Sequence, residues 1–154
     1  MSEEKTIRAQ DIMSRQPVTV GPKASIQDIV KLLIENDISG ILVVDDEDRL
    51  LGIISESDLL HKEVVPTIPD AINILGAIIY YNGVKEYRES FRKMMASTAE
   101  EIMTKKVISV NEEADLSEIG QRMIEHHIKR LPVLREGVLV GIISRTDMIR
   151  LLLE

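Results

Sequence analysis

The stretch Gly52-Ile53-Ile54-Ser55-Glu56-Ser57-Asp58 returns, with two changes, as Gly141-Ile142-Ile143-Ser144-Arg145-Thr146-Asp147. In both copies an apolar run ends at a serine, and an aspartate follows three residues later, which is typical of a helix start. The similarity extends outward from there. Ala9-Gln10-Asp11-Ile12-Met13-Ser14 returns as Ala99-Glu100-Glu101-Ile102-Met103-Thr104 at a shift of 103 − 13 = 90 residues. We therefore interpret the chain as a tandem repeat with a spacer.

Both units predict the same order of elements. A short acidic helical turn leads to a short strand, and an amphipathic helix with the 3.6-residue apolar period follows, with Ser25 and Asp115 as its caps. Two apolar runs joined by a tight polar turn then predict a hairpin, and a last helix follows. The pattern predicts an α+β fold of two pseudo-symmetric β-α-β-β-α units, packed sheet to sheet because neither unit alone buries both faces of its small sheet. The boundaries are residues 7–60 and 98–152, with an insert at 61–97.

The insert, residues 61–97, is predicted to be helical. Pro66 and Pro69 interrupt the chain, Asp70 is placed to cap a helix over residues 71–81, and Asn82-Gly83 ends it. A second helix is expected over residues 84–95. Two interpretations remain open: the insert is a packing surface or dimer interface, or it is a mobile cover over a ligand pocket.

Composition excludes several classes of protein. The 154 residues carry a formal charge of −7, only 3% are aromatic, and there is no cysteine. An acidic chain with few aromatic residues is a poor nucleic-acid binder, and disulfides and Cys-ligated zinc are excluded. The polar residues 1–5 do not resemble a secretory signal, and the longest apolar stretch, 71–81, is about half of what spans a bilayer. We expect a cytoplasmic protein without membrane segments.

The repeated unit resembles the CBS domain, the cystathionine-β-synthase-type repeat that forms a Bateman module when paired. The resemblance rests on both Gly-Ile-Ile-Ser-x-Ser/Thr-Asp segments, on the repeated Ile-Met-Ser/Thr, and on Ile128-Lys129-Arg130-Leu131-Pro132-Val133. It covers about two-thirds of the chain and leaves the insert unexplained. It implies regulatory binding of AMP, ADP, ATP or S-adenosylmethionine in clefts between the repeats. Such modules usually control an enzyme, channel or transporter.

The two Ser-x-x-Asp segments have a structural and a functional interpretation. Structurally, Ser55 or Ser144 caps the helix, and the aspartate reaches back to complete a capping box. Functionally, Asp58 or Asp147 accepts hydrogen bonds from the two ribose hydroxyls, while the helix N-terminus attracts phosphate. The two interpretations are compatible. Ser57 and Thr146 supply a further hydroxyl in the same turn.

Phosphate requires cations, and at matching positions the second unit supplies them where the first does not. It carries Lys129, Arg130 and Arg145 where the first unit has Ser39, Gly40 and Glu56. We therefore expect asymmetry, with the more highly charged nucleotide preferred where Arg130 and Arg145 lie. The other site would take a less phosphorylated or sulfonium ligand, or be empty. The candidates for contact with adenine are Thr19, Val20, Ile38, Ser109, Val110 and Ile128. All of them fit the hydrophobic core equally well as ordinary core residues.

Three hypotheses for function follow. The first is a sensor that binds an adenosyl ligand and signals occupancy to an unknown regulated protein. The second is an interaction or dimerisation scaffold with vestigial pockets. An enzyme is the weakest hypothesis, because the sequence has no phosphate-binding glycine loop, carboxylate metal site or nucleophile–His–Asp set. The adjacent His126 and His127 do not indicate a metal site, because neighbouring side chains on a helix point about 100° apart. The apolar C-terminal segment, residues 148–153, leads us to expect a homodimer.

Overall fold

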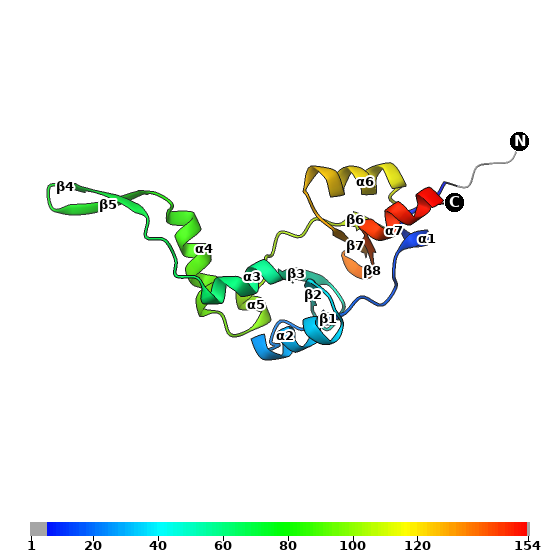
Figure 1. The fold of residues 1–154 in the computed structure, drawn as a ribbon, viewed down its shortest axis with the longest axis horizontal. Helices are drawn as coiled ribbons and strands as arrows, with labels where there is room; N and C mark the ends of the chain where they lie inside the picture. The colour runs from blue at the N-terminus through cyan, green and yellow to red at the C-terminus, as the bar shows by residue number, and fades with distance from the viewer. Residues whose placement is uncertain (1–5, 154) are drawn as a thin grey trace, which may run out of the picture. The chain divides into compact units, whose positions relative to one another are not determined.

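The structure is a computed structural model that describes residues 6–153. Residues 1–5, whose polar character underlies the expectation of no secretory signal, lie outside the described residues. Both repeats contain the predicted elements (Figure 1). The elements of the first repeat are α1 (Ala9–Ile12), β1 (Thr19–Val20), α2 (Ile26–Glu35), β2 (Gly40–Val44), β3 (Leu50–Ser55) and α3 (Glu56–Leu60). Those of the second repeat are α5 (Ala99–Ile102), β6 (Val110–Asn111), α6 (Leu116–Glu125), β7 (Arg130–Arg135), β8 (Val138–Ser144) and α7 (Arg145–Arg150). Short 3-10 turns follow at η1 (His61–Glu63) and η2 (Leu151–Leu153).

The long helix of each repeat starts at its predicted cap. The Ser25 hydroxyl accepts from the amide of Asp28 at 3.1 Å, and the Asp115 carboxylate accepts from the amide of Glu118 at 2.9 Å. Thr98 occupies the cap position of α5, but its hydroxyl donates to Glu101 at 2.9 Å and makes no capping bond. The predictions of α2 and α6 and of their caps are confirmed.

Each repeat has its own three-stranded sheet. The strand orders are β1-β2-β3 and β6-β7-β8. In the second sheet the short β6 pairs parallel to β7, and β7 pairs antiparallel to β8 through the predicted hairpin. β-branched and aliphatic residues fill the inner strands, and they supply core residues such as Leu131, Val133 and Ile143, which are completely buried.

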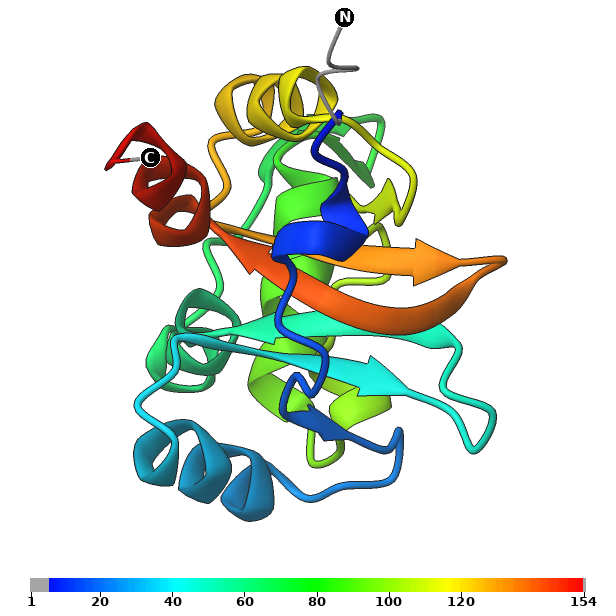
Figure 2. The ribbon, with the colours of Figure 1, turned by 90° about the vertical axis from the view of Figure 1, so that its right-hand side faces the viewer.

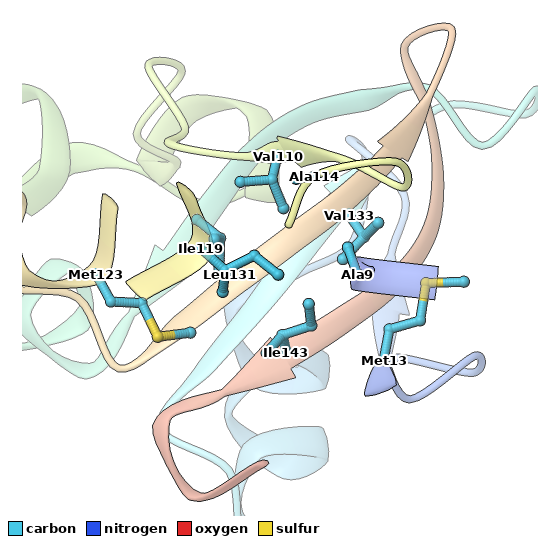
Figure 3. Close-up of a cluster of buried hydrophobic side chains, with 9 residues drawn as sticks. All are labelled: Ala9, Met13, Val110, Ala114, Ile119, Met123, Leu131, Val133 and Ile143. Carbon is cyan, nitrogen blue, oxygen red and sulfur yellow. The ribbon is translucent and has the colours of Figure 1, made fainter. Parts of the chain in front are cut away.

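The two short helices are exchanged between the sequence repeats. Within the described part, one spatial unit comprises residues 6–19, 44–51 and 105–153, and the other comprises residues 20–43 and 52–104. Ala9 of α1 and Met13, which follows it, lie in the core of the second repeat (Figure 3), and α1 lies across the β7–β8 pair (Figure 2). The Ala9 amide donates to Ala114 O at 2.8 Å. In the same way the Ala99 amide of α5 donates to Ala24 O at 2.9 Å, in the first repeat.

A glycine lies under each exchanged segment. A Cβ on Gly52 would lie 2.6 Å from the Met103 sulfur and 2.9 Å from the carbonyl oxygen of Thr104. A Cβ on Gly141 would lie 2.5 Å from the Met13 sulfur and 2.8 Å from Ser14 O. The two backbone oxygens are held by bridges to the adjacent strand residues, so they cannot move away cheaply.

We therefore expect Gly52→Ala and Gly141→Ala each to lower the free energy of unfolding by about 1–3 kcal/mol, because each overpacks a closed contact. Gly21→Ala is the control, since a Cβ there meets nothing within 4 Å. Urea unfolding curves of the three variants test this. Equal stability of Gly141→Ala and Gly21→Ala would contradict the close approach.

The insert differs from its prediction. Residues 71–81 do not form a helix: β4 (Asp70–Ile74) and β5 (Ala77–Asn82) form an antiparallel hairpin, and Asp70 begins a strand instead of capping a helix. Leu75 and Gly76 have φ values of 51° and 85°, as a two-residue hairpin turn requires, and Asn73 accepts from the Gly76 amide at 3.0 Å. The predicted second helix is confirmed as α4 (Val84–Met95), which begins after Gly83.

The described part of the chain contains no helix that is long and apolar enough to cross a membrane.

Candidate functional site

Both Ser-x-x-Asp segments form capping boxes, as predicted. At α3 the Asp58 amide donates to Ser55 Oγ at 3.3 Å, and the Ser55 amide donates to Asp58 Oδ2 at 2.8 Å. At α7 the Asp147 amide donates to Ser144 Oγ at 3.1 Å, and the Ser144 amide donates to Asp147 Oδ2 at 2.8 Å. The two capping boxes therefore have the same backbone hydrogen bonds. They differ in the other groups that contact the Asp58 and Asp147 carboxylates.

The Asp58 carboxylate is closed. Its Oδ2 also accepts from Ser55 Oγ at 3.2 Å, and its Oδ1 accepts from the Lys93 ammonium and, at 3.4 Å, from Thr104 Oγ1. A carboxylate offers about four acceptor positions, and these four donors fill them. The side chain of Asp58 is 7% exposed and that of Lys93 is 14% exposed, so the ion pair is largely shielded from water.

Lys93 reaches Asp58 because α4 of the insert is anchored beside α3. Lys62 donates to the carbonyl oxygens of Met94, at 2.9 Å, and of Ala96, which are left without helical partners at the end of α4. Arg92 donates to the carbonyl oxygens of Glu101, at 2.5 Å, and Met103, at 3.3 Å. Hydrogen bonds of three cationic side chains, Lys62, Arg92 and Lys93, thus fix the C-terminal half of α4 against this part of the chain.

The Asp147 carboxylate is open. Its ion pair with Arg150 is long: Arg150 Nη1 lies 3.9 Å from Oδ1, beyond hydrogen-bonding distance. The Ser144 amide donates a hydrogen bond to this side chain, which is 27% exposed. Asp147 therefore keeps acceptor positions that Asp58 has lost.

The cations of the second repeat gather at the same end of its sheet as Asp147. Arg130 begins β7 and is the register partner of Ser144, the capping residue. The Arg145 amide donates to Lys129 O at 2.9 Å, and Arg145 Nε donates to Ile128 O at 2.9 Å. Lys129 and Arg145 are exposed, and Arg130 is half-buried. The backbone positions of the three cations therefore lie at the end of the sheet where α7, the helix of Asp147, begins.

The corresponding end of the first repeat has the same backbone contact without the charges. The Glu56 amide donates to Ser39 O at 3.1 Å, as the Arg145 amide does to Lys129 O. Glu56 and Ser39 are exposed, and Gly40 begins β2. Here an acidic side chain stands where the second repeat has a guanidinium.

The remaining candidates lie at the starts of strands and helices. Val20 and Val110 are buried in the core, with 7% and 3% of their surface exposed, so little of either side chain is left for contact with a ligand. Ile128 packs against the core of the second repeat and is partly buried. The other half-buried candidates are Thr19, Ile38 and Ser109, and the exposed ones are Ser57 and Thr146.

Sequence reasoning did not identify Lys93 as a contact of Asp58. Lys93 was one of several charged residues on the polar side of a predicted helix, and nothing in its spacing distinguishes it from Lys85 or Arg88. The contact joins residues 35 apart and exists only because α4 docks beside α3.

Comparisons with known proteins give one family. The model of the CBS domain matches the chain twice, at residues 9–64 and 99–154. An uncharacterized protein of Methanocaldococcus jannaschii, MJ1426, is 31% identical over 154 residues, which is 94% of this chain and 90% of that protein. Other curated relatives are longer: the chain spans 58% of CBSX2 from Arabidopsis thaliana and 24% of an inosine-5′-monophosphate dehydrogenase from Nitrosopumilus maritimus.

Two solved structures with similar folds contain adenosyl compounds. The structure of CBSX2 in complex with AMP has a TM-score of 0.78 and 25% identity, and the match covers 95% of this chain and 96% of that one. The CBS domain pair of protein MJ0100, in complex with 5′-methylthioadenosine and S-adenosyl-L-methionine, has a TM-score of 0.67 and 25% identity, with 96% of each chain covered.

Proposed function

Because this chain belongs to the CBS domain family, we propose that it is a regulatory module that binds an adenine nucleotide and performs no chemistry on it. The observation that carries the proposal is the open Asp147 carboxylate beside Arg145, Lys129 and Arg130. A carboxylate with free acceptor positions suits the two hydroxyls of a ribose, and neighbouring cations suit a phosphate. The AMP, 5′-methylthioadenosine and S-adenosylmethionine in similar structures support the adenosyl class.

The two halves are proposed to differ in occupancy. In the first half a ribose would have to displace Lys93 from Asp58, and the displaced ammonium would lose its ion pair with that carboxylate. The same half has Glu56 where a phosphate would need a cation. The second half has neither obstacle. We therefore assign the nucleotide to Asp147 and infer one bound nucleotide per chain.

The identity of the ligand follows from charge. Arg145, Lys129 and Arg130 favour an anionic group, whereas the sulfonium of S-adenosylmethionine is cationic and gains nothing from them. The preferred ligand is therefore a phosphorylated adenosine, with affinity increasing from adenosine to AMP and on to the more highly charged nucleotides. Occupancy is transmitted to a partner protein through differential affinity for two conformations of the module.

Isothermal titration calorimetry with adenosine, AMP, ADP, ATP and S-adenosylmethionine tests this proposal. We expect one site per chain and tighter binding of the nucleotides than of adenosine or S-adenosylmethionine. A ligand that binds only the folded state stabilises it by about 2.7 kcal/mol at 100 times its Kd, so thermal unfolding gives a second readout. The absence of both heat and thermal shift with all five compounds would favour the scaffold.

Matched variants separate the phosphate contact from general effects of charge. Arg145→Ala should remove most of the difference in affinity between ATP and adenosine, whereas Glu56→Ala, at the equivalent position of the first repeat, should leave that difference unchanged. If Glu56→Ala changes nucleotide affinity more than Arg145→Ala does, the nucleotide lies in the first half.

A further inference from the structure

The Lys93 ammonium occupies the carboxylate that the first repeat would offer to a ribose. It donates to Asp58 Oδ1, and the pair is shielded, with 14% of the Lys93 side chain and 7% of the Asp58 side chain exposed. In the second repeat the corresponding oxygen of Asp147 lies 3.9 Å from Arg150 Nη1, too far for a hydrogen bond. The insert therefore supplies, from within the chain, a competitor for one of the two carboxylates.

The helix that carries Lys93 is held by polar contacts and not by a core. Over α4, residues 84–95, all of which the structure describes, no residue is buried, and Phe91 is 45% exposed. The C-terminal half of α4 is fixed by the hydrogen bonds of Lys62, Arg92 and Lys93. A segment with few buried apolar contacts opens at a lower free energy than the core does. Undocking of α4 is therefore a local event that leaves the core of the first repeat intact.

The connections at both ends of the insert allow α4 to move as a unit. Residues 64–69, all of them described, form no helix or strand and lead from η1 to the insert hairpin of β4 and β5. At the other end Ala96 is 2% exposed and Ala99 of α5 is completely buried, so the chain is anchored again directly after α4. Figure 1 shows the hairpin extending from the N-terminal end of α4. Residues 64–95 thus leave the first repeat and return to it, and they are tethered at both ends.

We propose that α4 is an autoinhibitory gate: Lys93 closes the first repeat, and a ligand at Asp58 and a docked α4 exclude each other. The gate rests on the proposed function in one respect, which is that the aspartate of a Ser-x-x-Asp segment binds ribose. Mutual exclusion is a negative coupling, and such a coupling acts in both directions. A ligand in the first repeat therefore releases α4 and the hairpin attached to it, and a partner that holds α4 in place weakens that ligand. Release of the insert is the physical signal of occupancy.

The ligand that opens the gate carries little negative charge. Glu56 is exposed at the position where the second repeat has Arg145, so a phosphate would meet a carboxylate there. Displacing Lys93 also removes the countercharge of the shielded Asp58, and an anionic ligand would not replace it. Adenosine has the ribose hydroxyls and no phosphate, and it is therefore the probe for the first repeat.

Calorimetry with adenosine tests the gate in the full chain carrying Asp147→Asn, so that binding reports the first repeat. Adding Lys93→Met should tighten adenosine binding by about ten-fold or more, because a site that is closed for about nine-tenths of the time loses that factor in affinity. Adding Asp58→Asn as well should abolish the gain. Lys85→Met, the same change at an exposed position of α4, should bind like the parent. If Lys93→Met fails to fold, Lys62→Met gives the same readout, because it removes contacts to the end of α4 and keeps the ion pair.

Hydrogen–deuterium exchange shows the direction of the movement. Amides of residues 84–95 should exchange faster in Lys93→Met than in Lys85→Met, and adenosine should speed their exchange in Lys62→Met. The gate is overturned if folded Lys93→Met binds adenosine no better than Lys85→Met, or if the gain survives Asp58→Asn. It is also overturned if adenosine slows the exchange, which would make the insert a cover that closes over the ligand. The proposed function is tested by AMP in a chain with Asp147 and an intact gate, so either can fail without the other.

Discussion

Replacing Asp147 with asparagine is expected to weaken the binding of AMP by roughly ten- to a hundred-fold. Asparagine keeps the size of the side chain and one acceptor oxygen, so the capping bond from the Ser144 amide can persist. It loses the charge and the second acceptor, and hydrogen bonds to a charged group contribute about 1.5–3 kcal/mol. That range corresponds to the stated change in Kd, which isothermal titration calorimetry measures.

A modified ligand shows whether the lost contact is the one to ribose. 2′,3′-Dideoxyadenosine monophosphate lacks both hydroxyls, so wild type and Asp147→Asn should bind it equally weakly. Asp58→Asn, the matched change in the first repeat, should leave the affinity for AMP unchanged, because Lys93 already occupies that carboxylate. If Asp147→Asn weakens AMP and the dideoxy compound by the same factor, the carboxylate does not bind the ribose.

Replacing Asp58 with alanine is expected to lower the free energy of unfolding by about 3–5 kcal/mol, the largest effect on stability that we predict. The change leaves Lys93, only 14% exposed, without its carboxylate, and removing one partner of a buried ion pair costs about this much. Asp147→Ala removes a capping box of the same geometry but leaves no buried charge behind, so it should cost about 1 kcal/mol. Urea unfolding of the two variants measures the difference.

A double variant identifies the ion pair as the cause. Adding Lys93→Met to Asp58→Ala removes the unpaired ammonium, and replacing both partners by apolar groups is often close to neutral. The double variant should therefore recover most of the stability that the single variant loses. Equal losses in Asp58→Ala and Asp147→Ala, or no recovery in the double variant, would show that Lys93 contributes little to the stability of the fold.

Local patterns in the sequence predicted most of the repeat fold. The capping boxes at Ser55 and Ser144 and the caps at Ser25 and Asp115 involve residues three apart, so the chain needs no tertiary information to form them. The strand pairs follow from two apolar runs joined by a short polar turn. That Lys129, Arg130 and Arg145 lie at one end of the sheet also follows locally, since Lys129 precedes β7, Arg130 begins it, and Arg145 follows its hairpin partner β8.

The failed prediction, the helix over residues 71–81, shows where local patterns were misread. An uninterrupted apolar run does not distinguish a helix from a strand by its periodicity. A hairpin is favoured by the β-branched and aromatic residues Ile72, Ile78 and Tyr80 and by the Leu75-Gly76 turn. The break in the chain was instead predicted at Asn82-Gly83, as the end of a helix. The Lys93 contact and the exchange of α1 and α5 were not predicted, because they join segments far apart in the chain.

The exchanged short helices set an order of events during synthesis. When only residues 6–60 have left the ribosome, the first repeat lacks α5 and the residues after it. In the folded protein the Ala99 amide of α5 donates to Ala24 O, and Thr104, shortly after α5, forms a bridge with Ile53. Meanwhile α1, which is translated before β8, must wait for β8 before Ser14 can form its bridge with Ile142. The first core can close once residues 99–104 have been translated, and the second only once β8 has been translated. A nascent chain interrupted in the insert therefore exposes apolar surface in its first half, and we expect such fragments to be substrates of cellular proteases.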